Sequence, residues 1–114
     1  LNYLGYSWVD LGKNLAIAHE MIKKAVEQRP NDAYIIDSLG WSLYKTGKYK
    51  EAILELEKAL EIIPNDPIIN DHFGDALWKA GYKTQAIFQW KRALIYKPER
   101  KLEKLIKNKI KFGI

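Results

Sequence analysis

Apolar residues recur at spacings of three and four along most of the chain, as on one face of a helix. Within residues 31–64, Leu39 and Leu43 share such a face, and a second series begins after Gly47. The second series consists of Tyr49, Ala52, Ile53, Leu56, Ala59, Leu60 and Ile63. Spacings of three and four are typical of amphipathic α-helices. The segment therefore predicts two helices joined by a turn.

Residues that start and stop helices stand at the ends of both series. Asp32, after Asn31, offers a side-chain oxygen to the first N-terminus, Gly47 suits a left-handed turn, and Pro64 blocks continuation of the second helix. Residues 65–98 repeat this plan with Asp66, Gly81 and Pro98. Both segments are therefore predicted to be helical hairpins.

The two hairpins are copies of one sequence unit. Residues 77–98 match residues 43–64 at eight of 22 positions, all at an offset of 34 residues. Small residues recur in register and include a mid-helix glycine, which costs about 1 kcal/mol relative to alanine. We expect them where neighbouring helices approach closely: Gly40, Ala52, Ala59, Gly74, Ala86 and Ala93. A fixed period of this size predicts a repeat array.

The repeat resembles the tetratricopeptide repeat in both length and motif. The first copy carries Leu39, Gly40, Tyr49, Ala52, Leu56, Ala59 and Pro64, and the second carries Phe73, Gly74, Gly81, Ala86, Trp90, Ala93 and Pro98. The second copy departs from the pattern at Asn70 and Lys83. The resemblance implies an all-α, right-handed superhelical solenoid in which the first helix of each hairpin lines the concave side. It also implies protein binding without catalysis.

The strings LGYSW, DSLGW and INDHFGDALW are similar to the C-terminal repeats of long bacterial multi-repeat proteins of poorly defined role. We expect one domain with four parts: a truncated repeat at 1–30, complete repeats at 31–64 and 65–98, and a capping helix at 99–114. The truncated first unit and the missing initiator Met predict a fragment of a longer array.

Composition and charge restrict the function classes. The chain has 114 residues, 47% hydrophobic content and no cysteine, which excludes disulfides and thiolate sites but leaves the compartment open. The formal net charge of +5 is concentrated in residues 97–114, which hold seven basic and two acidic residues. In that tail Leu102, Leu105, Ile106 and Ile110 form one apolar stripe, which predicts a capping helix with lysines on its solvated faces.

Aromatic and acidic residues share the predicted inner stripe of the first helices. Rigid aromatic side chains often dominate binding sites, and carboxylates would select a cationic or amide-rich segment. The Lys and Asn pattern with which this family holds a C-terminal carboxylate is missing. The alternative interpretation is that the aromatics pack between repeats and the acids are merely solvated. The candidate contact residues are Tyr6, Asp37, Trp41, Tyr44, Asp71, Asp75 and Trp78.

Three other functions compete with peptide binding. A structural spacer could self-associate as a homodimer through Leu1, Leu4 and Trp8. The basic tail could contact nucleic acid or an anionic membrane, but its single aromatic, Phe112, favours a solvated face. A metal site is disfavoured because His72 and Asp75 would give only two ligands, and the run GDALWKAG has too few glycines for a phosphate loop. The sequence alone supports no Ser-His-acid grouping. We therefore expect a non-catalytic scaffold without cofactor, metal or small-molecule substrate.

Overall fold

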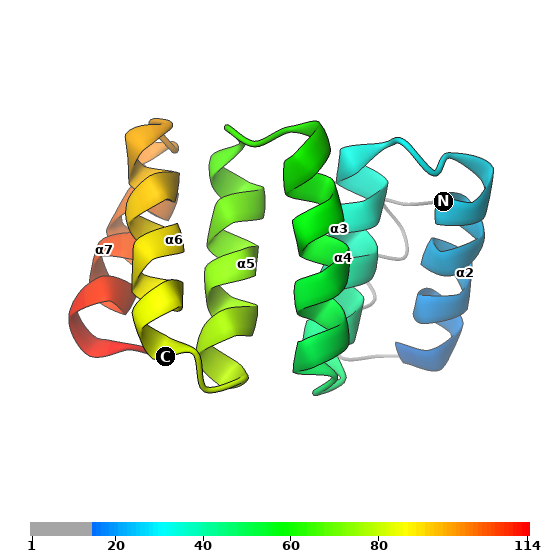
Figure 1. Ribbon diagram of the computed structural model, residues 1–114, viewed down its shortest axis with the longest axis horizontal. Helices are drawn as coiled ribbons and strands as arrows, with labels where there is room; N and C mark the ends of the chain where they lie inside the picture. The colour runs from blue at the N-terminus through cyan, green and yellow to red at the C-terminus, as the bar shows by residue number, and fades with distance from the viewer. Residues whose placement is uncertain (1–14) are drawn as a thin grey trace.

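The computed structural model describes residues 15–114, which form six α-helices and no strand. The helices are α2 (Leu15–Gln28), α3 (Ala33–Lys45), α4 (Tyr49–Ile62), α5 (Pro67–Lys79), α6 (Lys83–Ile95) and α7 (Arg100–Phe112). Each helix packs against the next in chain order, and α3 also contacts α5 (Figure 1). The prediction of an all-α helical solenoid is confirmed. The first helix expected in the truncated unit lies outside the described residues.

The predicted caps and turns are present in both hairpins. The Asp32 carboxylate accepts hydrogen bonds from the backbone N–H groups of Tyr34 and Ile35 at 3.0 and 3.2 Å. Asp66 does the same at the N-terminus of α5. The backbone φ is +82° at Gly47 and +99° at Gly81, a left-handed conformation that glycine adopts without strain. Repeated sequence signals thus set equivalent ends on equivalent helices.

The mid-helix glycines stand where two helices approach most closely. A Cβ atom added at Gly40 would lie 2.7 Å from Cγ of Leu56 on α4. The equivalent atom at Gly74 would overlap Cδ1 and Nε1 of the Trp90 indole on α6. Both hairpins therefore need a residue without a side chain at this crossing, as the sequence predicted.

The core runs through the stack in two adjoining clusters. One is centred on Ile22, Leu56 and Ile69, and the other on Trp90 and Ile106, all fully buried. Ile106 places the predicted capping helix α7 against the second cluster. Leu105, expected on the same stripe, is 51% exposed, because α7 turns the Leu102, Ile106 and Ile110 side towards the core. No helix in residues 15–114 is both long and apolar enough to span a membrane.

Candidate functional site on the inner face

The first helices of the two hairpins, α3 and α5, bring together the polar and aromatic residues of the predicted binding stripe. We use the term inner face for these side chains and for the part of the capping helix α7 that contacts them. Asp37, Trp41 and Tyr44 come from α3 and Asp71, Asp75 and Trp78 from α5. Tyr6 lies outside the described residues.

A buried ion pair joins α3 to α5. Nδ1 of His72 lies 2.8 Å from a carboxylate oxygen of Asp37, and both side chains are buried. Burial alone would lower the pKa of His72. The neighbouring Asp37, Asp71 and Asp75 outweigh that effect and raise the pKa above its ordinary value. The imidazole is thus held in a strongly acidic environment at the junction of two repeats.

A column of aromatic rings covers this ion pair. Trp41 stacks on His72 with ring centroids 4.1 Å apart and an interplanar angle of 22°. Tyr44 stacks on the same indole at 4.9 Å and 13°, and the Lys45 ammonium lies 5.1 Å from its centroid. Burial, with Asp75 nearby, raises the pKa of Tyr44, so its phenol keeps its proton. Trp41 and Tyr44 are both partly buried and pack against the first core cluster.

The other two carboxylates bind the terminal helix. Nζ of Lys109 on α7 lies 2.9 Å from Oδ1 of Asp71 and 3.0 and 3.1 Å from the two carboxylate oxygens of Asp75. Burial and Asp71 raise the pKa of Asp75, although Lys109 opposes the shift. Burial disfavours the Lys109 cation, but its two carboxylate partners raise its pKa overall. A single ammonium group therefore connects α7 to α5.

A second aromatic cluster lies at the far end of α5. Nε1 of Trp90 donates a hydrogen bond of 3.1 Å to Asp75, and Trp78 stacks on Trp90 at 5.5 Å and 29°. The Lys83 ammonium lies 5.0 Å from the Trp78 ring. Gly113, with φ of +77°, lies so close to Trp78 that a Cβ atom there would overlap the indole. Asp75 thus links the acidic network to this cluster.

The predicted site residues therefore fall into two linked groups. Asp37, Trp41, Tyr44, Asp71 and Asp75 share one network, whereas Trp78 belongs to the Trp90 cluster. The alternative interpretation is correct in part, because Trp41 of α3 packs on His72 of α5, in the next repeat. Its other half, that the acids are merely solvated, is wrong, because Asp37, Asp71 and Asp75 are only 7%, 4% and 4% exposed. Their role as contact residues stays a prediction. Within residues 15–114 no group of three His, Cys, Asp or Glu side chains is arranged to hold a metal ion.

Sequence reasoning missed two members of the network, His72 and Lys109. His72 follows Asp37 by 35 residues, about one repeat, so equivalent turns of α3 and α5 face each other. Lys109 lies three residues after Ile106 and seven after Leu102, on the stripe that packs against the core. A lysine on an apolar stripe signals a buried partner. That signal was available and would have marked Lys109 as buried, although it would not have identified Asp71 and Asp75 as its partners.

Comparison with known proteins agrees with the helical-repeat fold described above. Residues 40–81 match the family model described as TPR repeat. A TPR repeat-containing protein of Pseudomonas aeruginosa is 42% identical over 52 residues, which span 46% of this chain and 9% of that relative. The chain thus corresponds to a small part of the curated relative that it matches.

Solved structures share the fold. The type III secretion translocator chaperone SycD of Yersinia enterocolitica superposes with a TM-score of 0.86 at 19% identity, covering 96% of this chain and 86% of that one. MamA from strain AMB-1 gives a TM-score of 0.73 at 23% identity, covering 83% and 56%.

The helical hairpins, their 34-residue period and the matches define an α-helical repeat scaffold of the kind that mediates protein interactions. Residues 40–81 match a TPR repeat, and the chain is similar in sequence and fold to tetratricopeptide-repeat proteins. The members of this family are generally non-catalytic.

Proposed function

We propose that the inner face binds a peptide or protein segment without catalysis, with Trp41 and Tyr44 as its principal anchors. The observation that carries this proposal is the near-parallel stack of Tyr44, Trp41 and His72 above a buried ion pair. Rings held in place by stacking lose little entropy when a ligand binds. A fixed, partly exposed indole and phenol are therefore well suited to accept an apolar or planar group.

The carboxylates next to the aromatic rings contribute negative charge to the inner face. Among the described residues, Asp37, Asp71 and Asp75 pair with two basic side chains, His72 and Lys109, so carboxylates outnumber cations in this part of the network. A negative potential at the inner face favours a basic or amide-rich segment and disfavours an acidic one. Trp78 supplies a further anchor at the end of α5, and Tyr6 is proposed to extend the same stripe.

A peptide-binding series tests this proposal. Fluorescently labelled extended peptides of basic, apolar and acidic composition are titrated with the protein, and binding is followed by anisotropy. We expect a basic peptide with an aromatic residue to bind more tightly than its acidic counterpart. Trp41→Ala and Tyr44→Ala should each weaken this binding by about tenfold, the loss typical of an anchor residue.

Ile95→Ala is the control, because Ile95 is a 68% exposed apolar residue on α6 outside the inner face. Circular dichroism checks that every variant keeps its helices. Indifference to every basic or apolar peptide, or an equal loss in the Ile95 control, contradicts the proposal. A pull-down with the full-length parent, repeated with Trp41→Ala and Trp78→Ala, would then identify the natural partner.

A further inference from the structure

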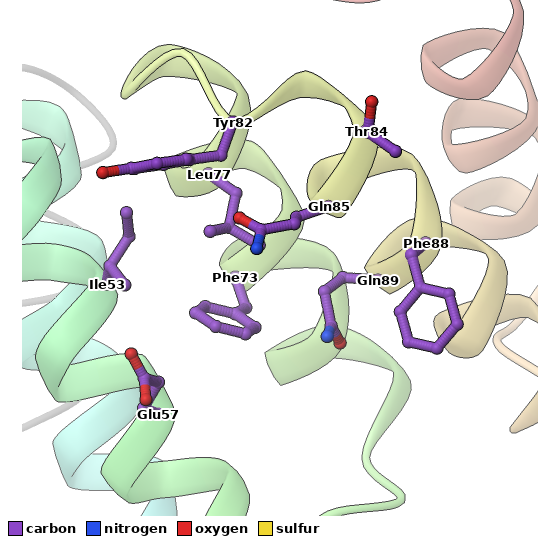
Figure 2. Close-up of a pocket in the computed structure, with 9 residues that line it drawn as sticks. All are labelled: Ile53, Glu57, Phe73, Leu77, Tyr82, Thr84, Gln85, Phe88 and Gln89. Carbon is purple, nitrogen blue, oxygen red and sulfur yellow. The ribbon is translucent and has the colours of Figure 1, made fainter.

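A hollow of about 740 Å³ opens on the side of the stack formed by the second helices (Figure 2). Phe73 and Leu77 from α5 form its floor. Its walls come from α4 and α6, and Tyr82 extends towards Ile53 at one end. A smaller hollow of about 270 Å³ shares Glu57, Phe73 and Gln89 with it and extends between α4 and α6. We call the two together the outer furrow.

The outer furrow combines an apolar floor with one acidic wall. Its rim exposes Tyr82 and Phe88, at 48% and 58%, which are large aromatics with accessible ring surface. Glu57 and Glu61, one turn apart on α4, form the acidic wall, whereas the α6 wall carries the neutral amides of Gln85 and Gln89 and, in the smaller hollow only, the guanidinium of Arg92. A complementary partner therefore presents an apolar ridge with positive charge along one flank.

Helix α7 presents such a ridge. Leu105 and Phe112, 51% and 75% exposed, are seven residues apart and so lie on the same side of the helix, away from buried Ile106. Exposed lysines flank this ridge at positions 101, 104, 107 and 111. Within residues 100–112 the only acidic residue is Glu103. The ridge and the outer furrow thus match in both polarity and charge.

The two surfaces cannot meet within one molecule. The packing order is α4 on α5, α5 on α6 and α6 on α7, so α7 lies at the end of the array beyond α6 (Figure 1). The outer furrow lies on the α4 side of α6. Lys109 and Ile106 hold α7 in that end position. A contact between ridge and furrow therefore requires two copies of the chain.

We propose that the outer furrow binds helix α7 of a second copy of this chain. Leu105 and Phe112 of one copy pack on Phe73 and on the Tyr82 and Phe88 rim of the other, and the lysines face Glu57 and Glu61. This is a helix-in-groove contact between two different surfaces. A head-to-tail contact of this kind leaves a free ridge at one end and a free furrow at the other, so the assembly grows with concentration until it closes into a ring or continues as a filament.

Sedimentation equilibrium over a range of protein concentrations tests the proposal. We expect the average mass to rise beyond that of a dimer, and the association to weaken at about 0.5 M salt because the flanking charges are screened. Phe88→Glu in the furrow and Phe112→Glu on the ridge should each weaken association by at least about tenfold. Ile17→Glu is the matched control, since Ile17 is 56% exposed on α2 at the opposite end of the array.

Mixing the two variants gives the most specific result. The Phe88→Glu chain keeps an intact ridge and the Phe112→Glu chain an intact furrow, so an equimolar mixture should form 1:1 heterodimers and stop there. A chain that stays monomeric up to about 1 mM overturns the proposal. Association that survives both substitutions also overturns the proposal, because it indicates a contact elsewhere, such as the N-terminal end. A mixture that stays monomeric although each variant is folded overturns it as well.

Discussion

Replacement of Gly74 by alanine tests the close packing on which the repeat depends. Alanine is the better helix former by about 1 kcal/mol, so helix propensity alone predicts a more stable protein. The structure predicts the opposite, because the new Cβ atom would overlap the indole of Trp90, which is fully buried. The two effects have opposite signs, which makes the experiment decisive.

The expected loss of stability follows from the contacts that the Trp90 indole would lose. Forcing one additional carbon into a filled core costs about 1–3 kcal/mol. Displacing the ring also disturbs the 3.1 Å hydrogen bond from Trp90 to the Asp75 carboxylate, which is worth about 1.5–3 kcal/mol. After the gain in helix propensity is subtracted, we expect Gly74→Ala to lower the free energy of unfolding by about 2–4 kcal/mol.

Urea denaturation followed by circular dichroism measures this change, with Gly40→Ala as the comparison. At Gly40 the obstacle is Leu56, a more flexible side chain without a hydrogen bond to lose, so the loss should be about 1 kcal/mol. Adding Trp90→Ala removes every indole atom that the new methyl group meets, and the Gly74→Ala penalty should then fall below about 1 kcal/mol. A Gly74→Ala protein as stable as the parent would refute the close-packing explanation.

Three further predictions concern the inner face and the helix ends. Lys109→Met leaves Asp71 and Asp75 buried without their cation and should lower the free energy of unfolding by about 3 kcal/mol. Adding Asp75→Asn should recover much of this loss, and urea denaturation of the single and double variants checks both expectations. Because the pKa of His72 is raised in the folded state, the contribution of His72 to stability is complete below about pH 6.5 and is lost as the pH rises through the folded pKa. The difference in stability between the parent and His72→Gln should therefore shrink from pH 6 upwards. A difference that grows with pH contradicts the raised pKa of His72. Asp66→Ala removes the side-chain acceptor for the N–H groups of Ile68 and Ile69 and should cost about 1 kcal/mol, read as a lower Tm than that of the Asp66→Asn variant, which keeps an acceptor oxygen.

The hairpins could be predicted from sequence because their signals are local and repeated. Gly47 and Gly81 adopt the left-handed turn that their residue type favours, and Asp32 and Asp66 cap the helices that follow them. The mid-helix glycines also carried a correct tertiary prediction, since an unfavourable residue at a repeated position requires a packing reason. Each of these predictions needed only residues close together in sequence, or the comparison of one repeat with the next.

The charge network of the inner face could not be predicted in the same way. Lys109 contacts Asp71 and Asp75, which lie 38 and 34 residues earlier in the sequence. From the sequence alone, the lysines of the tail are predicted to be solvated as a group. Asp37 and His72 meet only because the stacking brings equivalent turns of α3 and α5 together. Asn70, where the sequence departs from the family pattern, donates from its amide to the backbone oxygens of Pro64 and Asp66. These pairings depend on superhelical geometry, which no local pattern specifies.

The Asp75 carboxylate, which binds side chains of both α6 and α7, affects the order in which the helices of the array unfold. Terminal elements of a linear stack usually fray first, since they contact one neighbour only. Here Asp75 accepts from both the α6 indole and the α7 ammonium, so neither helix can separate without exposing a buried charge on α5. Amide hydrogens of α5, α6 and α7 should therefore exchange with solvent as one cooperative unit, and the final helix should show protection close to that of the penultimate hairpin.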